Sequence, residues 1–181
     1  MIVALQRTGA QVIALDFSHP MLRAGKDKAD KHGIRRVQAD AMQLPLHAAS
    51  AEAVTVAFGI RNVRDTRACL REIARILKPG GRLAILEFAP PRGISGSLFN
   101  FYFRQILPRI GGWVSGHRAA YRYLPESVAN YLAPAQFLEL VEAAGLRAAR
   151  ARALFPGVRV FDPACRVLPA AGAEWWGPGR A

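Results

Sequence analysis

The sequence of 181 residues contains little cysteine and no long apolar run. Its two cysteines, Cys69 and Cys165, are too few for a disulfide framework and lack the spacing of a metal site. Its apolar runs, such as AVTVAFGI, are far shorter than the roughly 20 residues that a helix needs to cross a bilayer. The histidines His19, His32 and His47 share no metal-ligand spacing either. We therefore expect a cytoplasmic protein without a metal site.

A glycine-rich nucleotide loop is also missing, because G-x-G-x-x-G occurs nowhere in the chain. In nucleotide-binding α/β proteins this loop lies about 20 residues before an acidic residue that binds a ribose. Asp16 ends the apolar stretch VIALD, but only fifteen residues precede it. The later KPGG follows a helical pattern instead of opening a helix. Asp16 therefore has the position of a ribose ligand without the loop that accompanies one.

Composition indicates one ordinary globular domain, with 51% hydrophobic and 21% charged residues. The net charge is +12, from 25 Lys and Arg against 13 Asp and Glu, so the surface should attract phosphates or anionic lipid headgroups. The basic residues accompany neither an aromatic ribonucleoprotein signature nor a helix-turn-helix pattern, so nucleic acid is not an expected partner.

Hydrophobic periodicity alternates between short strands and helices. Strands are predicted at 11–16, 34–40, 53–58 and 82–88, and helices at 19–33 and from residue 66 to Pro79 and Gly80. The second helix places Leu70, Ile73, Ile76 and Leu77 on one face. This alternation predicts an α/β fold, with a mostly parallel sheet and helices on both faces. Residues 161–181 lack a period and predict an irregular C-terminal tail after the domain of residues 1–160.

Polar residues follow the carboxyl ends of these strands, where ligands of parallel sheets bind. Asp16 and Asp40 each come at a strand end before a turn, and the third strand runs into AFGIRN. Each aspartate has two interpretations. It binds a cofactor, or it caps a local element, which for Asp16 is the helix entered at Ser18. The residues alone leave both open.

Several segments together resemble one family in order and spacing: VIALDFSHPML, VQADAMQLPLHAASAEAVTVAFGIRNVRD and REIARILKPGGRLAILEF. The chain resembles the ubiquinone/menaquinone biosynthesis C-methyltransferases, a branch of the class I methyltransferases that use S-adenosylmethionine. LKPGG is common to many class I methyltransferases, whereas FGIRNV and the segment 106–128 are more specific to the quinone branch. The resemblance covers residues 3 to 160, and Ala89 stands where the family has serine.

The resemblance implies a Rossmann-like fold and C-methylation of a prenylated quinol. It implies that Asp16 binds the ribose of S-adenosylmethionine, that Asp40 and Ala41 meet its adenine, and that Ala57 offers a backbone contact. Arg61 and Asn62 would be catalytic. Arg61 would stabilise the phenolate-like oxygen of the quinol. The alternative for Arg61 is a surface salt bridge.

The segment after the fourth predicted strand is implied to form the quinol pocket, lined by Tyr121, Tyr123 and Leu124. Core packing is the alternative for these three residues. An aromatic stretch just upstream, with Arg104 and Arg109 beside it, could rest on the inner face of the membrane that supplies the quinone, or be an ordinary buried helix.

Family spacing places the glycine loop and the first strand before Met1. We therefore expect the chain to begin inside the helix that follows the loop and to close that helix at Gly9. The missing strand would lie between residues 11–16 and 53–58, so we expect a truncated, poorly stable chain with little methyl transfer. Two alternatives remain: a class I methyltransferase for another small aromatic or lipid substrate, or an inactive remnant that acts only as a binding module.

Overall fold

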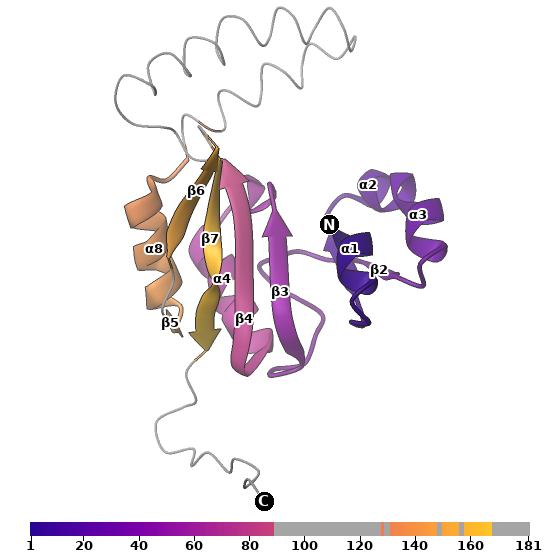
Figure 1. The fold of residues 1–181 in the computed structure, drawn as a ribbon, viewed down its shortest axis with the longest axis horizontal. Helices are drawn as coiled ribbons and strands as arrows, with labels where there is room; N and C mark the ends of the chain where they lie inside the picture. The colour runs from indigo at the N-terminus through magenta and orange to yellow at the C-terminus, as the bar shows by residue number, and fades with distance from the viewer. Residues whose placement is uncertain (89–127, 129–130, 148–149, 156–157, 168–181) are drawn as a thin grey trace, which may run out of the picture.

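The computed structural model describes residues 1–88, 128, 131–147, 150–155 and 158–167, which form an N-terminal and a C-terminal part (Figure 1). The N-terminal part, residues 1–38, contains two parallel strands and three short helices. Its elements are α1 (Ile2–Gln6), β1 (Ile13–Asp16), α2 (His19–Ala24), α3 (Lys26–Asp30) and β2 (Arg35–Gln38).

The C-terminal part, from residue 51 to residue 167, is built on a five-stranded sheet. Its elements are β3 (Ala51–Ala57), η1 (Ile60–Asn62), α4 (Thr66–Ile76), β4 (Leu77–Phe88), α8 (Pro134–Ala143), β5 (Leu146–Arg147), β6 (Ala151–Phe155) and β7 (Val158–Val167). β3 and β4 pair in parallel, and β7 runs antiparallel to β4, β5 and β6. The predicted α/β class with parallel strands is confirmed.

The helix predicted over residues 19–33 is two helices. Ser18 caps α2, where its hydroxyl accepts a hydrogen bond from the Met21 N–H at 3.4 Å. Gly25 then ends α2 and begins α3 with φ −85° and ψ 1°, so the helical hydrogen bonding is interrupted between them. The predicted single helix is wrong for this reason. The helix expected at the chain start is present as α1, and Gly9, with φ 85°, lies in the turn after it.

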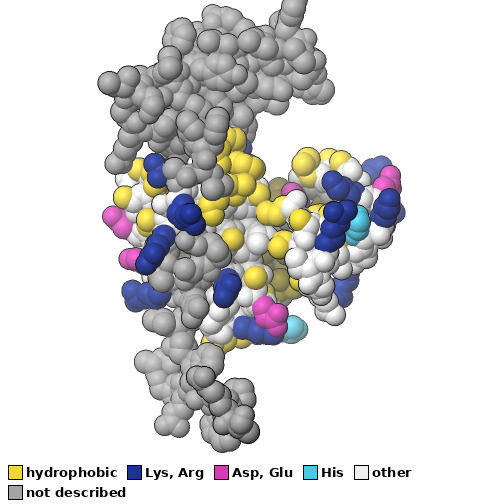
Figure 2. All heavy atoms as spheres, viewed as in Figure 1, with side chains coloured by type: hydrophobic (Ala, Val, Ile, Leu, Met, Phe, Trp, Pro, Cys, Tyr) yellow, Lys and Arg dark blue, Asp and Glu magenta, His cyan; other side chains and the backbone are white. Residues whose placement is uncertain are grey.

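No strand joins the two parts among the described residues. β1 pairs with β2 and β3 pairs with β4, but β1 and β3 belong to different sheets. Figure 2 shows hydrophobic side chains at the boundary between the two parts.

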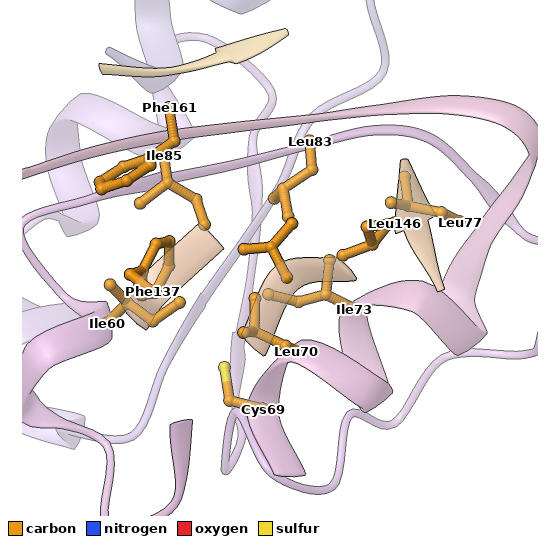
Figure 3. Close-up of a cluster of buried hydrophobic side chains, with 11 residues drawn as sticks. Ile60, Cys69, Leu70, Ile73, Leu77, Leu83, Ile85, Phe137, Leu146 and Phe161 are labelled. Carbon is orange, nitrogen blue, oxygen red and sulfur yellow. The ribbon is translucent and has the colours of Figure 1, made fainter. Parts of the chain in front are cut away.

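Helix α4 builds the core of the C-terminal part. Its N-terminus is capped by the Asp65 carboxylate, which accepts a hydrogen bond from the Ala68 N–H at 3.0 Å. The predicted apolar face is confirmed for Leu70, Ile73 and Ile76, which are buried on α4. Leu77 is buried too, but it begins β4. Side chains from α4 and β4 meet Phe137 of α8 in one cluster (Figure 3).

The junction between α4 and β4 explains the KPGG sequence. The predicted helix continues to Pro79 and Gly80, but Leu77 already has extended backbone angles and pairs with Ala51, so the helix ends at Ile76. Gly80 has φ 77°, which L side chains rarely adopt, and a Cβ on Gly81 would lie 2.8 Å from the Lys78 carbonyl oxygen. Both glycines are therefore required by the turn itself.

Strand β7 corrects the predicted tail. It continues to Val167, and its backbone pairs with β4 up to the Arg82–Arg166 position, so the irregular segment does not begin at residue 161. Pairing with β7 gives hydrogen-bond partners to the backbone groups on the edge of β4 that does not face β3. Residues 168–181 lie outside the described residues. None of the described helices combines the length and the apolar character that crossing a membrane requires.

Candidate functional site

The carboxyl ends of β1 and β2 lie at one edge of the N-terminal sheet. The strands are parallel, and the Asp16 position pairs with Gln38. Beyond the strand ends, the Ala39 N–H donates to the Asp16 carbonyl oxygen at 3.1 Å. The Gln38 side-chain amide donates to the Phe17 carbonyl oxygen at 3.0 Å. These bonds bring the backbone after Asp16 beside the segment that leads to Asp40.

Asp16 is exposed, and its carboxylate shapes the turn that follows. Its Oδ1 accepts a hydrogen bond from the Ser18 N–H at 2.8 Å, which places Ser18 to cap α2. The prediction that Asp16 itself caps α2 is wrong, because Ser18 is the N-cap and Asp16 supports the turn before it. Among the described residues, none donates a hydrogen bond to Asp16 Oδ2. One oxygen of Asp16 thus stabilises the turn, and the other can still accept a hydrogen bond from a ligand.

Asp40 is half-buried and begins a loop that is fastened to α4. Its Oδ1 accepts a hydrogen bond from the Met42 N–H at 2.8 Å. Two residues further on, the Leu44 N–H donates to Glu72 Oε2 at 2.8 Å, and Arg75 returns a hydrogen bond to the Leu44 carbonyl oxygen at 3.0 Å. The hydrogen bond from Arg75 lowers the pKa of Glu72 below its usual value. Asp40 and the neighbouring Ala41 are therefore held against the C-terminal part.

An open pocket of about 430 Å³ lies beside this loop. It is lined by the loop itself and by two side chains of α4, Glu72 and Arg75. None of the residues predicted to bind a ligand lines it. We assign the candidate site to the strand ends and not to this pocket.

The carboxyl end of β3 leads into a tight turn. Ala57 is the last residue of β3 and pairs with Leu86 of β4. Phe58 then adopts φ 56°, in the left-handed region that a bulky residue seldom occupies. Its N–H donates to the Leu86 carbonyl oxygen at 2.8 Å, and the 3-10 helix Ile60–Asn62 follows directly. Asn62 is exposed at the end of this turn.

Arg61 forms a buried ion pair with Glu87 of β4. Its Nη1 lies 2.6 Å from Glu87 Oε1, and the same nitrogen donates to the Phe58 carbonyl oxygen at 2.9 Å. The Glu87 side chain has 0% exposure and that of Arg61 has 8%. The salt bridge considered for Arg61 is thus real, but it is buried. Whether Arg61 also acts on a substrate stays a prediction.

Sequence reasoning missed Glu87, although a signal was present. Side chains in a strand alternate between its faces, so Glu87 shares a face with Leu83 and Ile85. Both of those residues are buried in the core, at 2% and 1% exposure. A carboxylate that continues an apolar face must be paired, because an unpaired buried charge is very costly. This pattern is the signal from which a cationic partner for Glu87 could have been predicted.

Two other buried groups lie near this turn. Burial raises the pKa of Tyr131, and the charge of Glu87 adds to the effect. Burial also raises the pKa of Cys69 to about 11, so its thiol is protonated at neutral pH and unreactive. The predicted quinol-pocket residues Tyr121, Tyr123 and Leu124 lie outside the described residues. Within the described part of the chain, no three His, Cys, Asp or Glu side chains gather as metal ligands.

The sequence pattern of the ubiE/COQ5 methyltransferase family matches residues 2–165. The chain is 46% identical over 140 residues to the demethylmenaquinone methyltransferase of Thermus thermophilus, covering 76% of this chain and 64% of the relative. It is 44% identical over 163 residues to the ubiquinone/menaquinone biosynthesis C-methyltransferase UbiE of Syntrophotalea carbinolica, covering 88% and 68%. The chain thus spans about two thirds of the length of these curated relatives.

Solved structures are similar in fold. A SAM-dependent methyltransferase from Aquifex aeolicus superposes with a TM-score of 0.62 at 17% identity, covering 87% of this chain and 72% of that one. A phosphoethanolamine N-methyltransferase from Haemonchus contortus, in complex with S-adenosyl-L-methionine, gives a TM-score of 0.61 at 21% identity, covering 84% and 32%. At these identities the likeness establishes the fold alone.

Proposed function

Because the chain belongs to the ubiE/COQ5 methyltransferase family, we propose that it methylates a ring carbon of a prenylated quinol with S-adenosylmethionine as methyl donor. The observation that carries the proposal is the identity of 46% and 44% to relatives named for this chemistry, over three quarters or more of the chain. The strand-end position of Asp16, Asp40 and Arg61 supports it, since ligands of such sheets bind at that edge.

The cofactor side of the site would be acidic. Asp16 is exposed and keeps one oxygen that no described residue uses, which suits a ribose hydroxyl. Asp40 and Ala41 would meet the adenine from the loop fastened to α4. Ala57 would contribute only backbone, because its methyl side chain carries no polar atom. These donor and acceptor types fit S-adenosylmethionine, which supplies an electrophilic methyl group when bound.

The reaction side would be formed by Arg61 and Asn62. Attack by a ring carbon on a methyl group needs electron density from the quinol oxygen, so that oxygen must become phenolate-like. A guanidinium stabilises such an oxygen, and an amide orients it. Arg61 would not take the quinol proton, because a guanidinium has no free acceptor site. A water would take that proton, the ring carbon would bond to the methyl group, and the methyl–sulfur bond would break to release S-adenosylhomocysteine. The quinol ring and its prenyl tail would contact Tyr121, Tyr123 and Leu124.

The direct test uses the 181-residue chain, methyl-labelled S-adenosylmethionine and demethylmenaquinol in detergent. A labelled menaquinol, identified by mass spectrometry, would support the proposal even at the low rate of methyl transfer expected above. So would methylated quinone restored by the chain in a strain deleted for its own quinone methyltransferase. If another small aromatic or lipid acceptor is labelled faster, the quinol is not the preferred substrate. If calorimetry shows cofactor binding but no acceptor is methylated, the chain is a binding module and not an enzyme.

The quinol substrate is water-insoluble, so we propose that the chain works in the cytoplasm and touches the membrane surface peripherally. Its net charge of +12 supports this, and Lys and Arg side chains gather over the part that holds α2 and α3 (Figure 2). Binding to vesicles that contain anionic lipid should weaken as the salt concentration rises, because salt ions screen the attraction between basic side chains and anionic headgroups. Sedimentation across a salt series measures it, and binding that ignores salt and lipid charge would contradict it.

A further inference from the structure

We propose that Glu87 is a positioning residue of this site, which holds Arg61 and the turn of residues 58–62 in one arrangement. The inference rests on the methyl transfer proposed above, because it concerns the same strand end. Glu87 lies in β4, next to β3, and reaches across to the turn that follows β3. It would not touch the substrate and would act through Arg61.

Both oxygens of the Glu87 carboxylate accept hydrogen bonds from this turn or from its own strand. Oε1 accepts from Arg61 Nη1 at 2.6 Å and from the Phe88 N–H at 2.8 Å. Oε2 accepts from the Arg61 backbone N–H at 3.3 Å. Arg61 is therefore fixed at both its backbone and its guanidinium by one carboxylate. Such double attachment determines where the guanidinium lies more strictly than a side-chain pair alone.

Stability alone does not account for a buried pair at this position. Removing two charges from water is costly, and apolar residues of similar volume often stabilise a core equally well or better. Leu83 and Ile85 on the same face of β4 show that the core accepts apolar side chains here. Apolar side chains, however, could not form the directional hydrogen bonds by which Glu87 holds Arg61.

The pair also supports a strained residue. Arg61 Nη1 bridges Glu87 Oε1 and the Phe58 carbonyl oxygen, and Phe58 has the left-handed φ of 56°. The Phe58 ring packs on Phe88 with centroids 4.7 Å apart, and the Arg61 guanidinium lies 5.4 Å from the centroid of the same Phe88 ring. A strained conformation persists only where its surroundings determine it. Glu87 thereby fixes the backbone that presents Asn62 at the strand-end edge.

The test compares three forms of the full chain with wild type: Glu87→Gln, the double variant Arg61→Met/Glu87→Leu, and Glu52→Gln as control. Glu52 pairs with Lys78 at 2.9 Å and also joins β3 to β4, but its side chain is 83% exposed. Three quantities are measured: the melting temperature, the amide hydrogen exchange of residues 58–62, and kcat and KM for methyl transfer.

We expect Glu87→Gln to speed exchange in residues 58–62 about tenfold or more, since it leaves Arg61 buried with a weaker partner. We expect kcat to fall about thirtyfold or more, with KM for the cofactor within about threefold, as for loss of a group that acts in the transition state. The double variant should regain the wild-type melting temperature without regaining slow exchange or kcat. Glu52→Gln should match wild type in all three.

Wild-type exchange in Glu87→Gln would overturn the proposal. So would a double variant that recovers exchange and kcat together with its melting temperature, because the pair would then serve only the fold. If the wild-type chain transfers no methyl group, the proposed function fails, and the exchange measurement alone decides whether Glu87 holds the turn.

Discussion

The N-terminal and C-terminal parts both carry candidate site residues, but they hold them by different means. In the N-terminal part only Ala29 and Ile34 are buried hydrophobic residues, and Asp16 is held by hydrogen bonds to its own turn. In the C-terminal part Arg61 is held by a buried carboxylate above a core that includes Leu70 and Phe137, both with 0% exposure. The cofactor side of the proposed site is thus locally ordered, whereas the reaction side is ordered by the core.

The charged contacts differ in the same way. Asp30 pairs with Lys26 and Arg36, and the hydrogen bond from Lys26 lowers the pKa of Asp30, but the Asp30 side chain is 46% exposed. Exposed pairs of this kind contribute little to stability. Phe17 and Met21 of the same part are 74% and 64% exposed. Ion pairs and apolar side chains alike therefore face solvent in the N-terminal part.

The largest expected difference concerns truncation of an apolar side chain. Leu70→Ala should lower the free energy of unfolding by about 3 kcal/mol, because it leaves a cavity in the core. Met21→Ala in α2 should change it by less than about 0.5 kcal/mol, since Met21 faces solvent. Urea unfolding of both variants measures the two values. A cost for Met21→Ala near that of Leu70→Ala would show that Met21 is covered, and the comparison would fail.

The next effect separates the two roles of Asp16. Asp16→Ala should weaken S-adenosylmethionine binding about tenfold to a hundredfold, the value of one hydrogen bond to a charged group. Asp27→Ala is the control, because Asp27 is an exposed aspartate of α3 away from the strand ends. Calorimetry on the folded variants decides. An unchanged dissociation constant would leave Asp16 with its turn-forming role alone.

The sequence predicted the elements whose periodicity follows from a buried face. Helix α4 and its apolar residues Leu70, Ile73 and Ile76 were identified because one face of the helix packs against the sheet. The break at Gly25 was missed, because an isolated glycine inside a helical pattern is often tolerated. Strand β7 was missed because Pro163 lies in its middle, where the register between β4 and β7 shifts.

The site was predictable as far as it follows from strand ends. Asp16, Asp40 and Arg61 were placed there because a predicted strand ends at Asp16, another ends at Asp40, and a third ends shortly before Arg61. The Arg61–Glu87 pair was not predicted, because it joins residues 26 positions apart through the pairing of β3 with β4. Such a contact depends on the tertiary register, which no local pattern encodes. An acidic residue on an apolar strand face is the one local sign of it.

The smallest expected effect concerns acid sensitivity and again distinguishes the two parts. The hydrogen bond from the Ala68 N–H lowers the pKa of Asp65, so its contribution to stability is complete above the unfolded-state pKa of about 4 and disappears as the pH falls through the lower folded-state value. Asp65→Asn keeps an oxygen that caps α4 but cannot titrate. The melting temperature of the C-terminal part should therefore fall less in Asp65→Asn than in wild type between about pH 5 and about pH 3, the range in which a carboxyl group titrates.

Asp30→Asn is the control and should leave that transition unchanged, because Asp30 pairs only with Lys26 and Arg36 of the N-terminal part. Circular dichroism melts across this range measure both variants. Equal effects of the two substitutions would mean that the parts unfold as one unit, and that the exposed pair of α3 stabilises the core as much as the cap of α4 does.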